Sequence, residues 1–270
     1  MPDRDLDLSD LAQGVSNWGR WGADDELGTL NHISDAQRAR GQSLVRSGRI
    51  VSLSRETALK DQPGLGDGRH EVSFWQHGSE DYVGLTFHGF AVTHLDALCH
   101  FFHEGKMYNG FSSDDVKPDG ARRGSSDKLG NGIAGRGVLF DIAALKGRAC
   151  EPGESISAAD LQAVAERQHL AMEPGDIVWV RTGCVRYLNT EGRAGLGPDC
   201  LPWLHQNRVA LLGTDGAADV FPTPYDEWAY PIHRIGLVFM GLHLVDNADL
   251  DPLAQACEEQ NRWEFFCSIA

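Results

Sequence analysis

The sequence is short of basic residues, and this limits the partners it can have. Its 270 residues include 24 Lys and Arg against 39 Asp and Glu, which gives a formal net charge of −15 at pH 7. A chain this acidic is repelled by phosphate backbones and by anionic lipid headgroups. We therefore expect no nucleic-acid partner and no membrane-surface partner, and we expect a small molecule as the binding partner instead.

Paired cysteines and long apolar segments are also missing. The six cysteines are scattered and form no Cys-x-x-Cys pair, which argues against a thiolate zinc site and against a disulfide framework. The longest apolar-rich run, residues 235–245, is shorter than the about 20 residues that cross a bilayer. The first residues show no basic segment followed by an apolar one, so no secretory signal is expected. Together these absences predict a cytoplasmic protein with reduced thiols.

Three common catalytic motifs are missing as well. The sequence has no Gly-x-Ser-x-Gly elbow, no Walker loop and no dinucleotide fingerprint. No serine or cysteine lies in a recognised nucleophile context. The residues that remain as candidates for chemistry are histidines and aspartates.

The most informative stretch is Thr93–His100, which contains three side chains able to bind a metal or carry a proton. In an extended strand alternate side chains share a face, so His94 and Asp96 point the same way, about 6.6 Å apart along the chain. That spacing suits two ligands of one cation, and imidazole with carboxylate suits zinc, manganese or iron(II). His100 is the candidate general acid and base, because its ordinary pKa lies near neutrality. A further metal ligand or a surface histidine are the alternatives for His100.

A metal needs a third protein ligand, and the sequence offers several. His88 is the nearest, but six residues of straight strand would place it about 20 Å from His94. It can join the site only if the chain bends or passes the metal on another strand. His243 and His233, both in a predicted C-terminal strand region, are alternatives. Asp215 ends another predicted strand, where sites in α/β sheets are found, and a plain turn residue is its competing interpretation.

Two residues directly after the motif could contact a substrate. Tyr108 carries a phenol and Asn109 an amide, and such groups orient a carbonyl or stabilise an oxyanion. An ordinary turn is the alternative. The segment 108–136 is rich in Gly, Ser, Asp and Lys and shows no periodicity. Its length predicts a lid or a substrate loop.

The remaining pattern predicts one α/β domain of mixed topology. Residues 1–47 form the predicted N-terminal arm, which packs on the core or on a partner subunit, and residues 48–270 form the predicted catalytic domain. Apolar alternation and apolar runs predict strands at 50–54, 72–76, 83–87, 137–142, 209–215 and 263–270. Residues 175–183 are predicted as a turn, a strand and a turn, and residues 233–245 as one long strand or a pair of strands. Caps and helical periodicity predict helices at 157–168, 199–208 and 251–261.

Three segments also resemble a known family. They are Asn17–Asn31 (NWGRWGADDELGTLN), Thr93–Phe101 (THLDALCHF) and Gly241–Asn247 (GLHLVDN). They resemble the putative cyclase family, which includes bacterial kynurenine formamidase, isatin hydrolase and a trans-dienelactone hydrolase. The likeness covers nearly the whole chain. It implies a swivelling β/β/α fold, hydrolysis that depends on one or two divalent ions, zinc or manganese, and a homodimer or homotetramer.

The resemblance also assigns residues to a metal motif. Three residues match the second His, the Asp and the last His of the formamidase branch: His94, Asp96 and His100. The first His of that motif would fall at Phe90, its Pro at Leu98, and a downstream Glu at Met240. The resemblance implies that His88 and His243 replace the missing ligands.

Three functions are compatible with these residues. The first is metal-dependent hydrolysis of an amide, imide or lactone in a small substrate that could be aromatic. The second is cyclisation or dehydration of a polyketide-like carbonyl substrate, with His100 abstracting a proton next to the carbonyl. The third is a non-catalytic family member that has lost its metal, which Phe90 and Met240 suggest.

Overall fold

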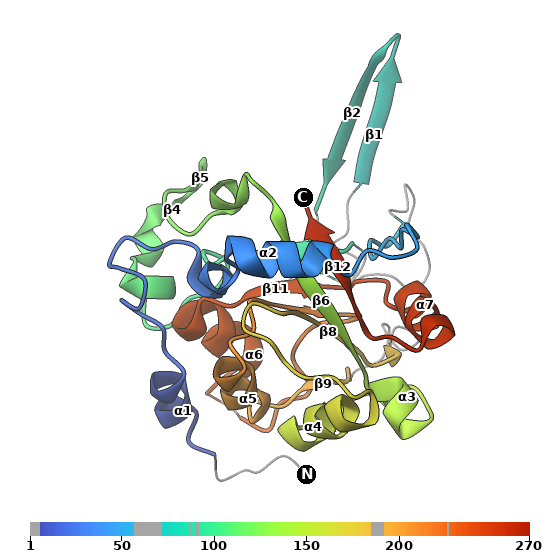
Figure 1. Ribbon diagram of the computed structural model, residues 1–270. Coiled ribbons are helices and arrows are strands. Elements are labelled where there is room, and N and C mark those ends of the chain that lie inside the picture. The colour runs from blue at the N-terminus through green and yellow to red at the C-terminus, as the bar shows by residue number, and fades with distance from the viewer. Residues whose placement is uncertain (1–5, 57–71, 87, 90–91, 185–191, 226) are drawn as a thin grey trace.

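A six-stranded mixed sheet forms the centre of the molecule (Figure 1). The computed structural model describes residues 6–56, 72–86, 88–89, 92–184, 192–225 and 227–270. The strand order is β12 (Glu264–Ile269), β6 (Ile133–Asp141), β8 (Ile177–Arg181), β10 (Leu211–Thr214), β11 (His243–Asp246) and β3 (His94–Asp96). The four middle strands are parallel, and both edge strands run antiparallel to their neighbours. The predicted mixed α/β domain is confirmed.

Apolar side chains cover both faces of this sheet, which explains why its middle strands are nearly continuous apolar runs. On one face, alternate residues such as Val138 and Val178 pack against helices. These helices are α1 (Leu8–Gly14), α4 (Ala158–Arg167), α5 (Cys200–Gln206), α6 (Pro231–His233) and the π-helix η6 (Arg234–Met240). On the other face, Leu139 and Trp179 belong to a second cluster. This cluster includes residues of α7 (Asp251–Gln260) and of the 3₁₀-helix η1 (Gly28–His32).

Most predicted helices and strands are confirmed. Ser157 caps α4 in a capping box with Asp160, and Pro252 stands in the first turn of α7, as expected from their sequences. The predicted strands at 72–76 and 83–87 form a hairpin of β1 (Val72–His77) and β2 (Glu80–Leu85). Phe87 itself lies outside the described residues.

The predicted strand at 50–54 is wrong, and the strand prediction at 233–245 is right only for its last residues, where β11 (His243–Asp246) begins. The region 233–245 contains the end of α6 and all of η6 before β11 begins, because its apolar residues are buried on every side of a helix rather than on two faces of a strand. A short apolar run of this kind suits a buried helix as well as a buried strand. The segment 50–54 is irregular, and Ile50 is 92% exposed.

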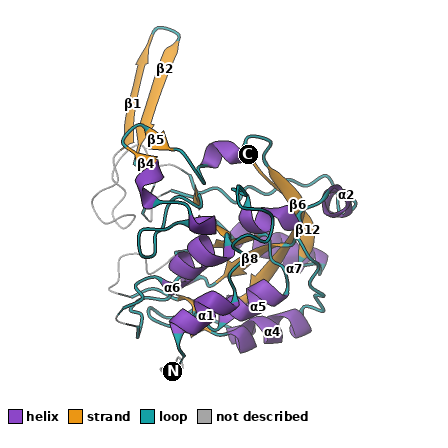
Figure 2. Cartoon of the chain, turned by 90° about the vertical axis from the view of Figure 1, so that its left-hand side faces the viewer, coloured by secondary structure: helices purple, strands orange, loops and turns teal. Residues whose placement is uncertain are grey.

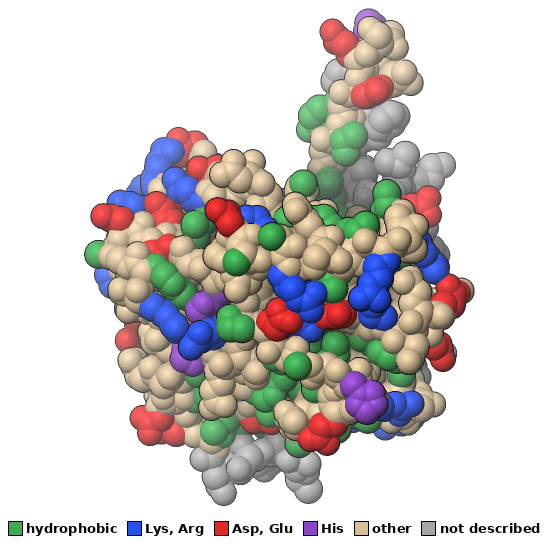
Figure 3. All heavy atoms as spheres, in the orientation of Figure 1, with side chains coloured by type: hydrophobic (Ala, Val, Ile, Leu, Met, Phe, Trp, Pro, Cys, Tyr) green, Lys and Arg blue, Asp and Glu red, His purple; other side chains and the backbone are tan. Residues whose placement is uncertain are grey.

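The hairpin of β1 and β2 projects from the body of the molecule (Figures 1 and 2). Its described side chains include three exposed apolar residues, Tyr82, Val83 and Leu85, and Figure 3 shows hydrophobic side chains along it. Within the part of the chain that the structure describes, no helix is long and apolar enough to cross a membrane.

The remaining elements are short. They are α2 (Asp35–Gln42), η2 (Tyr108–Gly110), η3 (Ser113–Asp115), β4 (Val116–Lys117), β5 (Gly120–Ala121), η4 (Ser126–Leu129), α3 (Ile142–Lys146), β7 (Ser155–Ile156) and β9 (Gly195–Leu196). The segment 108–136, predicted as a lid or substrate loop, therefore folds into helical turns, a small hairpin and the start of β6.

The N-terminal arm packs on the core through backbone contacts with η6. The side chains of Asn17 and Trp18 donate to the carbonyls of Met240 at 2.9 Å and Val238 at 2.6 Å. The arm and the end of η6 also cross at two glycines, because a Cβ on Gly28 would lie only 2.0 Å from the carbonyl oxygen of Gly241. Only glycine permits so close an approach of two backbones.

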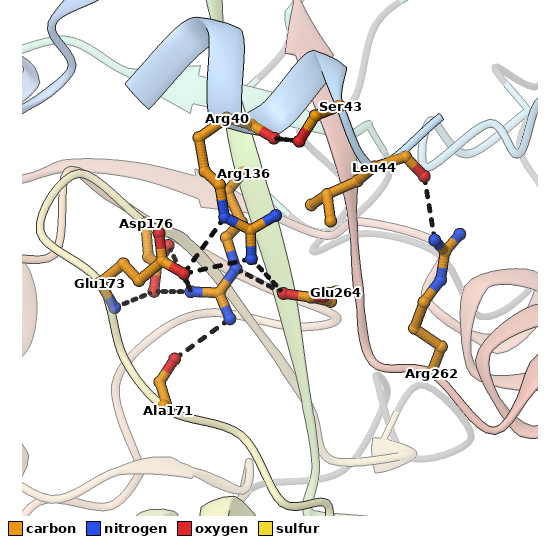
Figure 4. Close-up of polar contacts among 9 residues, drawn as sticks. All are labelled: Arg40, Ser43, Leu44, Arg136, Ala171, Glu173, Asp176, Arg262 and Glu264. Atoms are coloured by element: carbon orange, nitrogen blue, oxygen red, sulfur yellow. Dashed lines mark hydrogen bonds and ion pairs between the residues drawn. The ribbon is translucent and has the colours of Figure 1, made fainter. Parts of the chain in front are cut away.

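A buried ion network joins β6 to the segment before β8 and to β12 (Figure 4). Arg136 donates through one nitrogen to both oxygens of Asp176, at 3.0 and 2.9 Å, and through another to Glu264 at 2.9 Å. The side chains of Arg136 and Asp176 are only 5% and 1% exposed. Arg40 of α2 contacts Glu264 and Glu173 at the margin of this network. The network therefore links the edge strand to the centre of the sheet.

Replacing Arg136 by Met should destabilise the protein, because it leaves the carboxylate of Asp176 buried and unpaired. We expect the free energy of unfolding to fall by about 3–5 kcal/mol, measured by urea titration. Arg122→Met is the matched control, since Arg122 pairs with Asp119 on the surface, where the side chains are 58% and 70% exposed. Its loss should stay below about 1 kcal/mol. Equal losses in the two variants would contradict this account of the network.

His243 gives a second prediction, because it is buried on the sheet face opposite to that of Leu244 and Asp246. Burial lowers the pKa of His243 from its ordinary value of 6.5 to about 4, and hydrogen bonds with the backbone of Asp96 and Leu27 oppose this effect only in part. Between about pH 6.5 and pH 4 the folded protein therefore binds fewer protons than the unfolded chain. Its stability falls as the pH falls through this range.

His243→Leu should remove this component of the acid sensitivity. We expect the loss of unfolding free energy between pH 6.5 and pH 4 to be smaller in the variant by about 3 kcal/mol, as the shift in pKa implies. At pH 7 the variant should be as stable as the parent or more stable, because an apolar side chain replaces a buried polar ring. His169→Asn, at an exposed position, serves as control. An unchanged pH profile in His243→Leu would rule the explanation out.

Candidate active site

The pairing of β3 with β11 brings two carboxylates and one imidazole onto one face at the edge of the sheet. They belong to Asp96, Asp246 and His94. His94 lies opposite Asp246, and Asp96 lies opposite Leu244. Directly opposed residues of antiparallel strands point to the same side, and His94 and Asp96 share that side through strand alternation. The face they share is also the face of Leu244 and the first apolar cluster. Cross-strand register, rather than local sequence, therefore assembles this group.

Asp96 is the centre of the group, and its side chain is only 2% exposed. Its Oδ1 lies 3.2 Å from Nε2 of His88 and 3.5 Å from Nε2 of His94. Its Oδ2 lies 3.3 Å from Nε2 of His233 and 3.9 Å from Nε2 of His100. Imidazole rings therefore surround one buried carboxylate on both of its oxygen atoms.

Two sets of three residues are close enough to hold a cation each. His88, His94 and Asp96 form the first set, and Asp96, His233 and Asp246 form the second, with the ligand atoms of each set within 4.8 Å of one another. Asp96 belongs to both sets. The arrangement therefore offers two neighbouring cation positions, which we call the first and second positions, with a shared carboxylate.

The donor groups fit a divalent metal. Carboxylate oxygens and imidazole nitrogens are ligands of zinc and of related first-row ions. Asp96 Oδ1 is buried beside the Nε2 atoms of His88 and His94, at 3.2 and 3.5 Å, and a buried carboxylate oxygen needs a compensating positive partner. A cation at the first position would satisfy it.

Charge strongly shapes the ionisation of this group. Burial opposes the charged form of Asp96, but hydrogen bonds from His233 and His88 hold the pKa of Asp96 well below its usual range. Burial likewise opposes the charged form of His233, whereas the carboxylates of Asp246 and Asp219 raise the pKa of His233 well above its ordinary value. The Asp96 carboxylate therefore remains ionised and needs positive charge beside it.

His100 lies at the more open side of the group, with a side chain that is 34% exposed. Its ring stacks on that of His88 with centroids 4.1 Å apart. Burial lowers the pKa of His100, and the Asp96 carboxylate opposes this effect in part. A neutral imidazole that reaches both the buried carboxylate and the solvent is suited to accept a proton.

A bend in the chain explains how His88 reaches a group centred six to eight residues further on. Gly89 has a φ of 120°, a backbone conformation that side chains other than glycine's rarely adopt. Asn247 donates to the carbonyl of Gly89 and so fixes the bend. This is the bend on which the role of His88 depended in the sequence. Phe90, which stands where the formamidase branch has a ligand, lies outside the described residues.

His243 is not brought to this group. It lies beside Leu211 of β10, on the face of the second apolar cluster, whereas Asp246 lies on the opposite face. The prediction of His243 as a metal ligand does not fit this geometry, because one residue of offset in a strand changes the face. Asp215 is also separate, since its carboxylate accepts hydrogen bonds from Thr182 and Gly183.

Tyr108 and Asn109 hold the N-terminal arm rather than a substrate. The hydroxyl of Tyr108 donates to Asp25 at 2.9 Å, and Tyr108 is only 1% exposed. Asn109 donates to the carbonyls of Gly22 and Ala23 and accepts from the backbone of Gly19. With their polar atoms occupied in this way, neither residue is placed to hold an oxyanion. Their role in the sequence prediction does not fit the structure.

The sequence interpretation missed Asp246 and Asp219. Asp246 lies within the segment that carries the family resemblance, but its role depends on register with β3. Asp219 contacts Nδ1 of His233 at 2.5 Å and lies in a loop without a recognisable motif. His233 was one of several candidates, and its contact with Asp219, fourteen residues earlier, depends on the tertiary fold rather than on a sequence signal.

Aromatic rings line the side of the group near His100. The ring of Phe101 lies 5.4 Å from that of His233 and 6.3 Å from that of Tyr230. Tyr230 is 40% exposed. Further along, His103 stacks on Trp228 with centroids 4.7 Å apart. Aromatic surface therefore adjoins the carboxylate and imidazole groups on the side of His100.

Comparisons with solved structures identify similar folds. A crystal structure described as a novel cyclase has 26% sequence identity and a TM-score of 0.84, over 94% of this chain and 92% of that one. An isatin hydrolase bound to the product analogue thioisatinate has 16% identity and a TM-score of 0.52, over 80% and 86% of the two chains. Isatin hydrolase A from Labrenzia aggregata, bound to benzyl benzoate, has 19% identity and a TM-score of 0.50, over 74% and 80%.

Sequence comparison gives the family directly. No curated protein matches the chain. The family model described as Putative cyclase matches residues 51–218, a span that includes the His94–Asp96 strand, the chain leading to β10 and Asp215. Because this match covers more than half of its length, the chain belongs to the putative cyclase family.

Proposed function

We propose that the protein is a metal-dependent hydrolase that cleaves an amide, imide or lactone bond in a small substrate. The observation that carries this proposal is the shared carboxylate of Asp96, which lies between two sets of ligand groups. His88, His94 and Asp96 would hold a divalent ion at the first position. Asp96, His233 and Asp246 would hold another at the second position, with zinc or manganese as the proposed metals.

Divalent ions held in such a site polarise a carbonyl oxygen and lower the pKa of water. The protein's own residues supply the remaining requirements of hydrolysis. His100 accepts a proton from the attacking water and returns it to the leaving nitrogen or oxygen. Its partial exposure and its distance of 3.9 Å from Asp96 place it at the boundary between the buried group and the solvent.

The aromatic rings beside His100 support a planar substrate. Phe101 and Tyr230 meet edge to face, with an interplanar angle of 75°, and flank the side chain of His233. Aromatic surfaces bind flat conjugated groups through stacking and apolar contact. The proposed substrate is therefore an aromatic or otherwise conjugated formamide, imide or lactone.

Cyclisation or dehydration of a carbonyl compound is the second candidate, because the same His100 could remove a proton next to a polarised carbonyl. Mass analysis of the product separates the two reactions. Hydrolysis adds the mass of one water, cyclisation adds none, and dehydration removes one. A product without added water would reject the hydrolase proposal.

Metal content tests the site itself. Protein purified without a metal-binding tag and loaded with zinc or manganese should hold two ions per chain, one for each set of ligands. His94→Ala and His233→Ala should each retain one ion, and Asp96→Asn should retain neither tightly, because it alters both sets. Elemental analysis of dialysed protein measures this. His243→Leu is the control and should retain both ions, and full occupancy in Asp96→Asn would reject the site.

His100→Asn tests the proton carrier. The variant should lose about 10²–10⁴-fold in kcat while its metal content is unchanged, since His100 is placed outside both sets of ligands. The measurement is turnover of the best substrate from a screen of aromatic formamides, imides and lactones. His169→Asn is the matched surface control and should keep full activity. An unaffected kcat in His100→Asn would assign the proton transfer to another group.

A further inference from the structure

Asp219 is buried, and its side-chain hydrogen bonds all go to one short segment. Its Oδ1 accepts from the backbone N–H of Ile232 at 2.7 Å. Its Oδ2 accepts from the backbone N–H of His233 at 3.1 Å and contacts the Nδ1 atom of the same residue at 2.5 Å. Asp219 is only 1% exposed. One carboxylate therefore holds both the backbone and the ring of His233.

This contact determines which ring nitrogen of His233 points toward the second position. With Nδ1–H donating to Asp219, the other ring nitrogen faces the acidic groups. Nε2 lies 3.3 Å from Oδ2 of Asp96 and 3.2 Å from Oδ2 of Asp246. Histidines that bind metals usually donate their second ring N–H to a carboxylate or a carbonyl, which fixes the tautomer and the orientation of the ring.

The loop that carries Asp219 is itself held in place by β9. Leu196 donates to the carbonyl of Ala218 at 2.8 Å. A Cβ on Gly195 would lie only 2.3 Å from the carbonyl carbon of Asp219, so the two backbones touch. The same loop also contacts the second position directly, since the backbone N–H of Ala218 donates to Asp246 at 3.2 Å. The loop therefore orients two of the three side chains of that position.

We propose that Asp219 is a positioning residue for the second metal position, where it holds His233 with Nε2 directed between Asp96 and Asp246. The inference rests on the proposed metal-dependent function. Its competing explanation is a structural one, in which Asp219 only satisfies the backbone N–H groups at the start of α6. The two explanations differ in what an amide at this position would do.

Asp219→Asn separates them. The amide oxygen can still accept from the backbone N–H of Ile232, whereas the amide NH₂ replaces the oxygen that accepts from the backbone N–H of His233, so the start of α6 keeps one of its two bonds. The amide NH₂ cannot accept from Nδ1–H, and it favours the tautomer in which Nε2 carries the proton and cannot bind a metal. A structural role predicts a change in stability and no selective effect on the metal, whereas a positioning role predicts a selective loss at the second position.

The experiment is a titration of metal-free full-length protein with Co²⁺, followed by visible absorption and by calorimetry. The parent protein should bind two ions. Asp219→Asn should bind one ion as tightly as the parent and the other 10–100-fold more weakly. The loss should be confined to the component of the Co²⁺ spectrum that comes from the second position. His94→Ala should lose the other component. Asp160→Asn, a matched change in the capping box of α4, should bind both ions like the parent.

Two results would overturn the proposal. If Asp219→Asn binds both ions like the parent, the positioning role falls and the proposed function stands. If the parent protein itself binds no Co²⁺, the proposed function falls and the positioning role with it. Should Asp219→Asn fail to fold, Asp219→Ser makes the same measurement, because serine can still accept one backbone N–H, and the same selective loss is expected.

Discussion

The charge of the Asp96 carboxylate must be compensated inside the protein, because its side chain is only 2% exposed. Removing an ion of this size from water costs several kcal/mol in real proteins. The fold meets this cost with imidazole rings that come from separate segments: the chain before β3, β3 itself, the turn after it and α6. Because β3 lies at the edge of the sheet, all of these segments can reach the two carboxylate oxygens of Asp96.

The part of the site that could be predicted from the sequence is the part governed by local geometry. Strand alternation places His94 and Asp96 on one face, and the structure has them in that arrangement. Asp246 could not be inferred in this way, since its place depends on pairing between strands about 150 residues apart. The helical segment before β11 was predicted as a strand because an apolar run does not distinguish the two when every side is buried. Tyr108 and Asn109 were predicted near a substrate because their partners, in residues 19–25, are distant in the sequence.

The two faces of the sheet are different environments, and strand β11 contributes side chains to both. On β11, Asp246 faces the carboxylate and imidazole group, whereas His243 and Val245 face an apolar cluster. Burial keeps the pKa of His243 low, at about 4, so this histidine is neutral where its charge would be unfavourable. Carboxylates raise the pKa of His233 instead. Two histidines ten residues apart therefore have opposite ionisation behaviour, and their chemical roles follow from the face and the neighbours rather than from the residue type.

The contacts between the N-terminal arm and η6 affect the order in which the chain can complete its fold. Asn17 is synthesised well before the carbonyl of Met240 that it binds, which is 223 residues further along. At about 5–20 residues per second, synthesis of that interval takes roughly 10–45 s. Throughout this time the aromatic and glycine-rich arm has no native partner in η6, and contacts so distant in sequence form slowly in general. The arm can close over η6 only after the chain has been made through Met240, so this contact forms later than the contacts among the residues between them.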